Sequence, residues 1–151
     1  MDRLEVLRRS DLFHYLDEDD LKTVEKMCTP KVFEAGAIVC RQDKEVEEIC
    51  VIEEGLVSIL LELGPTDKRQ IQSASNFECC CWSAGIPPYR CTCTVKALER
   101  TKLLAFKGKE LRALVYTNPK LCAEIAGGVA NVISKRLRVA FTQLMGVTYQ
   151  D

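Results

Sequence analysis

The stretch that decides the fold lies in the first half of the chain and reads Ile49-Cys50-Val51-Ile52-Glu53-Glu54-Gly55-Leu56-Val57. Apolar residues flank a short turn that contains Gly55, and this pattern predicts a β-hairpin. Similar short runs, separated by turn residues, recur on both sides at a spacing of about ten residues. The predicted strands cover residues 31–34, 38–41, 49–52, 57–63, about 69–73, 91–98 and 103–106.

Helices are predicted at both ends of this strand-rich region. Residues 3–9 and 18–28 come first, the second beginning with an acidic turn that suits a helix N-terminus and ending before Pro30. Residues 109–116 and about 120–145 come last, separated by a break at Asn118-Pro119. This order predicts an α+β protein that is mainly β, a small barrel or sandwich flanked by helices.

Length and composition favour one ordinary globular domain covering residues 1–151. The chain has 21 Lys and Arg against 22 Asp and Glu, and 47% of its residues are apolar. We expect no transmembrane segment, because no run of about 18 apolar residues occurs. The charged N-terminus lacks the apolar core of a secretion signal, so we expect a cytoplasmic location. No block of Lys and Arg predicts nucleic-acid binding.

The sequence also argues against an enzyme. Its single histidine, His14, leaves little for acid–base chemistry or a His-rich metal site. It contains no Ser/His/Asp set, no phosphate-binding P-loop and no paired carboxylates that we can assign to a reaction. We therefore predict no catalytic residues, no metal ligands and no tightly bound cofactor.

Cysteine is the unusual component, with nine residues. An odd count without a leader peptide predicts reduced thiols, and no C-x-x-C spacing for zinc occurs. Cys28, Cys40, Cys50 and Cys122 lie in apolar patterns and are expected to be small buried hydrophobes. The remaining group is Cys79-Cys80-Cys81 with Cys91 and Cys93. If both segments are extended, 79 and 81 share one strand face, and 91 and 93 another. The group either fills core positions or forms a redox, metal or iron–sulfur sensor.

The last predicted helix carries a wide apolar surface. Two neighbouring stripes make it up: Leu121, Ile125, Val129 and Val132, then Ile133, Leu137, Ala140 and Leu144. Such width exceeds one packing face. Either all of it packs on the strands, or its distal part pairs with a second copy of the chain, giving a homodimer through residues 120–145.

An ordered set of glycines and hydrophobic residues covers nearly the whole chain. It consists of Leu12, Phe13 and Leu16, then Phe33, Gly36 and Ile38, then Ile49, Gly55 and Val57, then Thr94, Val95 and Ala97, and finally Pro119 and Leu121. This set resembles the cyclic nucleotide-binding domain of catabolite-activator-type regulators, cyclic-nucleotide-dependent kinases and gated channels. The resemblance implies an eight-stranded jelly-roll β-barrel between N-terminal helices and a long C-terminal helix. It also implies a phosphate-binding cassette between two strands.

In that family the cassette reads Phe-Gly-Glu, a short helical turn, then Arg followed by a small residue. Alignment on Thr94-Val95 places Cys81 at the glycine, Trp82 at the glutamate that binds ribose, and Cys91 at the arginine that binds phosphate. Loss of a charged phosphate contact costs about 1.5–3 kcal/mol. Both charged anchors are missing, which argues against ordinary binding of cyclic AMP or cyclic GMP.

Arg90 lies one residue before the expected arginine. A shift of one residue on a strand turns a side chain to the opposite face, unless the Pro87-Pro88 loop restores the register. Trp82 either offers a stacking surface for a ligand or plugs the pocket. The expected ligand-binding residues are Cys81, Trp82, Ser83, Ala84, Arg90, Cys91 and Thr92.

The resemblance implies a stand-alone sensor that binds a small ligand, such as a nucleotide, at this variant cassette and signals through its C-terminal helix. Family regulators append a helix-turn-helix domain after that helix, whereas this sequence ends at Asp151, so we expect no DNA-binding domain. The partner is then a small molecule or a protein. Two alternatives remain: a ligand-free interaction scaffold, and a cysteine-based redox or metal sensor.

Overall fold

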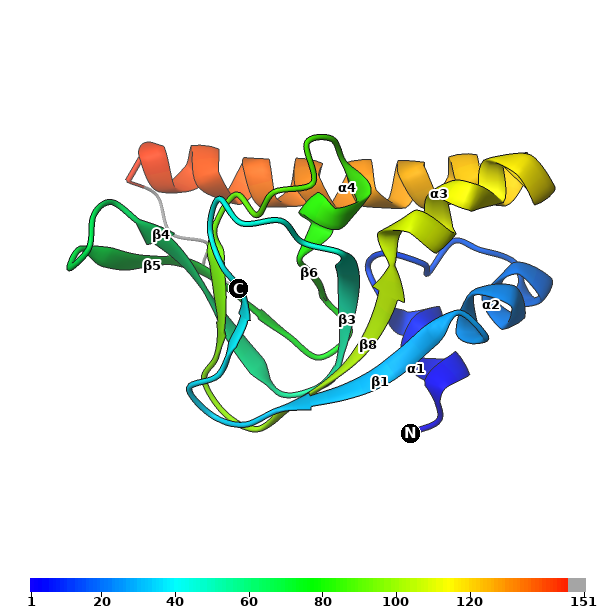
Figure 1. Cartoon of the computed structure of the whole chain (residues 1–151), viewed down its shortest axis with the longest axis horizontal. Coiled ribbons are helices and arrows are strands. Elements are labelled where there is room, and N and C mark those ends of the chain that lie inside the picture. The colour runs from blue at the N-terminus through cyan, green and yellow to red at the C-terminus, as the bar shows by residue number, and fades with distance from the viewer. Residues whose placement is uncertain (147–151) are drawn as a thin grey trace.

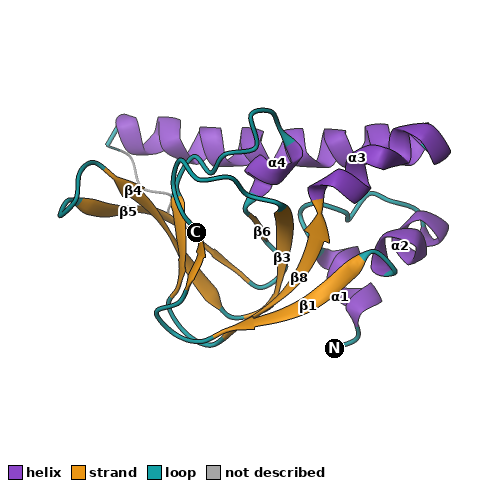
Figure 2. Ribbon diagram, viewed as in Figure 1, coloured by secondary structure: helices purple, strands orange, loops and turns teal. Residues whose placement is uncertain are grey.

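The computed structural model describes residues 1–146, and its helices lie around two layers of strands (Figures 1 and 2). In chain order the elements are α1 (Arg3–Arg9), α2 (Glu18–Glu25), β1 (Cys28–Phe33), β2 (Ile38–Cys40), β3 (Glu48–Glu54), β4 (Leu56–Glu62), β5 (Lys68–Ser75), β6 (Cys79–Cys80), the 3-10 helix η1 (Trp82–Gly85), β7 (Thr94–Ala97), β8 (Thr101–Lys107), α3 (Gly108–Thr117) and α4 (Pro119–Leu144). The predicted domain over residues 1–151 includes residues 147–151, which lie outside the described residues.

The strands form two antiparallel sheets of four, ordered β1-β8-β3-β6 and β2-β7-β4-β5. The predicted mixed α+β class is confirmed, whereas the closed barrel is wrong: within residues 1–146 the strand pairing does not join the two sheets into a barrel. One reason is visible in β1, which pairs only with β8 and contains Pro30. Proline has no N–H to donate, so it is tolerated in an edge strand such as this one.

The hairpin predicted around Gly55 is wrong, because β3 and β4 lie in different sheets and do not pair with each other. Two further segments differ from the sequence-based boundaries. The second helix was predicted to reach residue 28, but α2 ends at Glu25 and β1 begins at Cys28. The strand predicted over 91–98 is shorter, because β7 starts at Thr94. Cys91 and Cys93 therefore do not share the face of a regular strand.

The helix boundaries follow from capping residues. Asp17 accepts a 2.9 Å hydrogen bond from the N–H of Asp20 at the start of α2, as its acidic first turn predicted. Asn118 accepts a 3.2 Å bond from the N–H of Leu121, and Pro119 occupies the first turn of α4. The predicted break between the last two helices is therefore confirmed.

The apolar interior has two parts. One lies between the helices and the β1-β8-β3-β6 sheet, where Phe13 meets Phe106 edge-to-face at 5.1 Å. The other lies between the two sheets and includes Ile52, Val57 and Leu103. Four cysteines also belong to or pack against this second part, which is the interior of the sandwich: Cys40, Cys50, Cys80 and Cys81.

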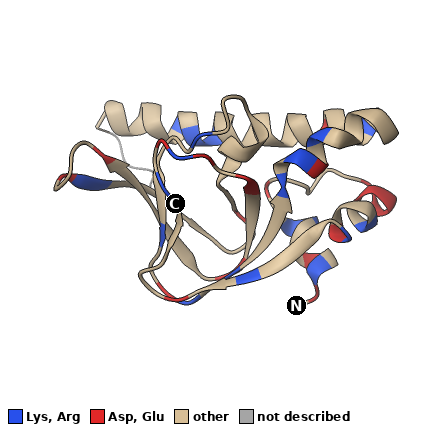
Figure 3. Cartoon of the chain, in the orientation of Figure 1, with Lys and Arg blue, Asp and Glu red and all other residues tan. Residues whose placement is uncertain are grey.

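Helix α4 crosses the molecule above the strands and the cassette (Figure 1). Its first predicted stripe, from Leu121 to Val132, is buried as expected. The distal stripe is only partly covered: Ile133 and Ala140 are half-buried, whereas Leu137 and Leu144 are 50% and 82% exposed. Phe141, which lies beside this stripe, is 57% exposed. No described helix combines the length and apolar character that crossing a membrane requires. Positive and negative side chains are interspersed over the elements (Figure 3).

Candidate ligand-binding site

The cassette begins with a sharp turn at Cys81. This residue has a left-handed backbone with φ of 60°, and η1 follows it directly. The expectation that Cys79 and Cys81 share a strand face is wrong, because β6 ends at Cys80. Cys79 instead belongs to the helix-facing core, and its N–H donates to Asp11 Oδ1 at 2.9 Å.

Five of the seven predicted residues come together on one pocket between the sheets. These are Cys81, Trp82, Ser83, Cys91 and Thr92, and the pocket is completed by Cys40, Ile59, Cys93 and Val95. Its cavity has a volume of about 10 Å³, which is roughly the room for one water molecule. The lining contains no Lys, Arg, Asp or Glu side chain.

The other two predicted residues lie elsewhere. The Nη1 atom of Arg90 donates to the carbonyl oxygen of Asp43 at 3.0 Å, and its backbone pairs with Glu45. The Pro87-Pro88 loop therefore does not direct Arg90 into the pocket. Ala84 is buried on the far side of η1, where it lines a different cavity.

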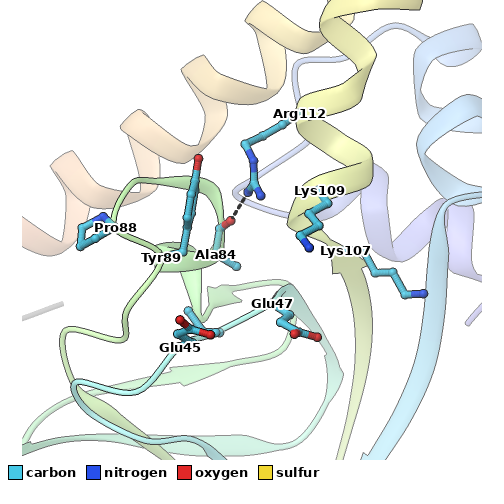
Figure 4. Close-up of a pocket in the computed structure, with 9 residues that line it drawn as sticks. Glu45, Glu47, Ala84, Pro88, Tyr89, Lys107, Lys109 and Arg112 are labelled. Carbon is cyan, nitrogen blue, oxygen red and sulfur yellow. Dashed lines mark hydrogen bonds between the residues drawn. The ribbon is translucent and has the colours of Figure 1, made fainter.

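That second cavity, of about 310 Å³, lies between the cassette, the loop before β3 and the start of α3 (Figure 4). Its wall carries charges of both signs, from Glu45, Glu47, Lys107, Lys109 and Arg112. Sequence analysis missed this cavity, because its walls come from three distant segments and follow no sequence pattern.

A pair of thiols lies at the first pocket. Sequence analysis placed Cys81 there but did not place Cys40 beside it. Cys81 Sγ donates to Cys40 Sγ across 3.1 Å. Hydrogen bonds from Cys81 and Cys91 stabilise the thiolate of Cys40 and lower its pKa, whereas the pKa values of Cys81 and Cys91 are raised. Cys50 faces Cys80 across β3 and β6. Of the four cysteines predicted to be small buried hydrophobes, Cys50 is buried, whereas Cys28, Cys40 and Cys122 are only partly buried.

The thiols do not assemble into a metal centre. Within residues 1–146, no three or more Cys, His, Asp or Glu side chains are placed so that they could hold a metal ion. All nine cysteines are free thiols.

Helix α4 is fastened over the cassette by Arg136. This guanidinium donates to the carbonyl oxygen of Ser73 at 2.9 Å, pairs with Glu78 at 3.4 Å and lies 6.0 Å from the ring centre of Trp82. Trp82 is half-buried and packs against the helix-facing core. One side chain of α4 thus contacts β5, the turn before β6 and the cassette.

Known proteins share both the sequence pattern and this fold. The sequence profile of the cyclic nucleotide-binding domain matches residues 30–118. A protein of Rhodopseudomonas palustris, provisionally named a potassium channel protein, is 28% identical over 141 residues; these are 93% of this chain and 34% of that protein. The chain thus spans about a third of the length of this curated relative.

Solved structures agree in fold. A cyclic nucleotide-binding domain from Methylobacillus flagellatus superposes with a TM-score of 0.83 at 13% identity, covering 98% of this chain and 83% of that one. The regulatory domain of Toxoplasma gondii PKA, solved with cAMP, gives 0.66 at 23% identity, covering 73% and 42%. Because the family profile matches more than half of the chain, and the overall fold is shared, the chain belongs to the cyclic nucleotide-binding domain family.

Proposed function

We propose that the chain is a non-enzymatic sensor domain that binds a small ligand at the cassette Trp82–Thr92 and signals through α4. The observation that carries this proposal is the convergence of five cassette residues on one pocket beneath a helix that packs on the same cassette. Membership of the family supports a regulatory or sensor role in general.

The ligand is not held as cyclic nucleotides usually are in this family. The family binds the cyclic phosphate with an arginine, whereas this pocket lining contains hydroxyl, thiol and indole donors but no Lys or Arg side chain. A cavity of about 10 Å³ also excludes any nucleotide unless the cassette moves. Ligand binding therefore displaces Trp82 or the backbone around it.

Displacement of Trp82 gives a route to α4. Trp82 and Glu78 both contact Arg136, so a ligand that moves the cassette changes the contacts that hold the helix. The two states would differ in whether α4 lies docked on β5 and the cassette, and the ligand shifts the balance between them.

The test uses Trp82 as its own reporter, since it is the single tryptophan of the chain. The reduced protein is titrated with cyclic AMP and cyclic GMP by calorimetry and by tryptophan emission. We expect no binding at micromolar concentration. Micromolar binding would show that backbone amides or Arg90 replace the missing anchors.

For any ligand that is found, Trp82→Ala is expected to change the affinity. Tyr116→Ala is the matched control, because Tyr116 lies on α3 and is 88% exposed. Equal affinity in the wild type and the Trp82 variant would show that the ligand binds elsewhere. No response to any small molecule, together with capture of a defined protein partner, would favour the ligand-free scaffold.

The distal part of α4 is the surface we propose for a second copy of this chain. Leu137, Phe141 and Leu144 are exposed there, beyond the segment that packs on the core. Pairing of two such helices would bury these side chains. In sedimentation experiments the wild type should be a dimer, and Phe141→Glu should be a monomer. A wild type that is monomeric at all concentrations would contradict the proposed dimer.

A further inference from the structure

Two thiols that are distant in sequence lie in direct contact. Cys40 ends β2, and Cys81 forms the turn that leads into η1. Their sulfur atoms are 3.1 Å apart. A disulfide bond is about 2.05 Å long, so the two atoms need to approach by only about 1 Å.

The pair can be reached from solvent. Cys40 is only partly buried, and it lines a cavity of about 310 Å³ together with Cys50 and Cys81. Exposed Glu45 and Glu47 line the same cavity, which is therefore open to solvent. The carboxylates disfavour anionic oxidants such as glutathione disulfide, whereas a small neutral peroxide can enter.

We propose that Cys40 and Cys81 are a site of reversible oxidation, at which hydrogen peroxide converts the two thiols into a disulfide. This inference goes beyond the proposed function and does not require a ligand. The bond would join β2 to the start of the cassette and hold the turn at Cys81 against the sheet.

The chemistry assigns a different role to each thiol. The Cys40 thiolate attacks one peroxide oxygen, the O–O bond breaks, and the departing oxygen leaves as water after taking a proton. Cys40 is then a sulfenic acid. Cys81 gives up its proton and attacks the Cys40 sulfur, the S–O bond breaks, and a second water leaves. In sum, two thiols lose two hydrogens and one peroxide becomes two waters. A dithiol reductant reverses the reaction by exchange.

The hydrogen bond in this pair fits that assignment. Cys81 donates to Cys40, so the sulfur that accepts is the one better able to exist as a thiolate. The same contact acts to lower the pKa of Cys40 and to raise that of Cys81. Thiolate character favours attack on peroxide.

The other cysteines provide internal comparisons. Cys79 is fully buried in the helix-facing core. The Cys28 thiol contacts the carbonyl oxygen of Glu25, and the Cys122 thiol contacts the carbonyl oxygen of Leu111. Two thiols compete with this pair: Cys91 also lies beside Cys40, and Cys50 also lies beside Cys81.

The test treats the reduced full chain with one equivalent of hydrogen peroxide, blocks the remaining thiols with iodoacetamide and measures the intact mass. We expect a species that has lost two hydrogens and carries two fewer blocked thiols. Tryptic digestion without reduction then locates the bond. Cys40 lies in the peptide 32–41, Cys81 in 70–90, and Cys91 in 91–96. The expected product joins 32–41 to 70–90, and dithiothreitol releases it.

Because 70–90 contains three cysteines, variants and fragment spectra assign the partner. Cys81→Ser should abolish the linked peptide, whereas Cys80→Ser and Cys122→Ser should retain it. Tandem mass spectra of the wild-type linked peptide give the same assignment if a variant does not fold. A link from 32–41 to 91–96, a link between two chains, or sulfinic acid without any linked peptide would each overturn the proposal.

Discussion

The guanidinium Nη1 of Arg112 donates a 2.7 Å hydrogen bond to the carbonyl oxygen of Ala84, and this bond ties α3 to the cassette (Figure 4). The same guanidinium lies 4.0 Å from the centre of the Tyr89 ring. One side chain therefore contacts both the η1 helix and the loop that follows it. The position of the cassette depends on α3 as well as on α4.

Arg112→Ala is expected to lower the free energy of unfolding by about 1.5–3 kcal/mol, because a hydrogen bond from a charged group to a buried carbonyl is lost. Urea denaturation measures the change. Lys109→Ala is the control: Lys109 lines the same cavity but is exposed, so its removal should change stability by less than about 0.5 kcal/mol. Equal effects of the two substitutions would contradict a specific role for Arg112.

Two adjacent glycines of α4 should respond oppositely to alanine. A Cβ on Gly127 meets nothing within 4 Å, so Gly127→Ala should stabilise the protein by about 0.5–1 kcal/mol through helix propensity. A Cβ on Gly128 would lie 2.4 Å from the carbonyl oxygen of Leu12, so Gly128→Ala should cost about 1–3 kcal/mol. Thermal and urea unfolding of both variants measure these two changes in stability. A stabilising Gly128→Ala would show that α4 does not pack this closely on the N-terminal turn.

Arg136→Gln should loosen α4 from the cassette. The side chain is 11% exposed and holds Ser73 and Glu78, so its loss should leave Trp82 in a more polar environment. We expect tryptophan emission to shift to longer wavelength and the urea midpoint to fall. Arg138→Gln, an exposed change on the same helix, should alter neither. An unchanged emission spectrum in Arg136→Gln would mean that this arginine does not couple the helix to Trp82.

Asp11 should make stability depend on acidic pH. Burial raises its pKa above the ordinary 3.8, against the opposing effects of the Cys79 N–H and of Lys135. The folded protein thus holds this proton more tightly than the unfolded chain. The resulting stabilisation is complete below the ordinary pKa and is lost as pH rises through the folded-state value.

Asp11→Asn, which stays neutral and can still accept from Cys79, should therefore gain stability relative to the wild type as pH rises from 3 to 7. Urea unfolding at several pH values measures this difference. Asp19→Asn is the control, since Asp19 is exposed. If the wild type instead gains stability relative to Asp11→Asn as pH rises, the ion pair with Lys135 outweighs the effect of burial.

Much of the fold could be predicted because its evidence is local. Apolar residues on both sides of Gly55 specify the strands β3 and β4, and the caps at Asp17 and Asn118 specify where helices begin. The cassette could be located because Thr94 and Ala97 fix the register of the strand after it. The separation of the strands into two sheets could not be predicted, since barrel closure depends on pairing between edge strands that are far apart in the chain.

The sequence by itself determined the family and the order of elements, because these are properties of residue types at fixed spacings. Only the tertiary structure decided which side chains meet. It brought Cys40 to Cys81, turned Arg90 to the Asp43 carbonyl and placed Arg136 over Trp82. Contacts of this kind join segments tens of residues apart, and a one-residue change of register or a left-handed turn such as that at Cys81 reverses a side chain's direction.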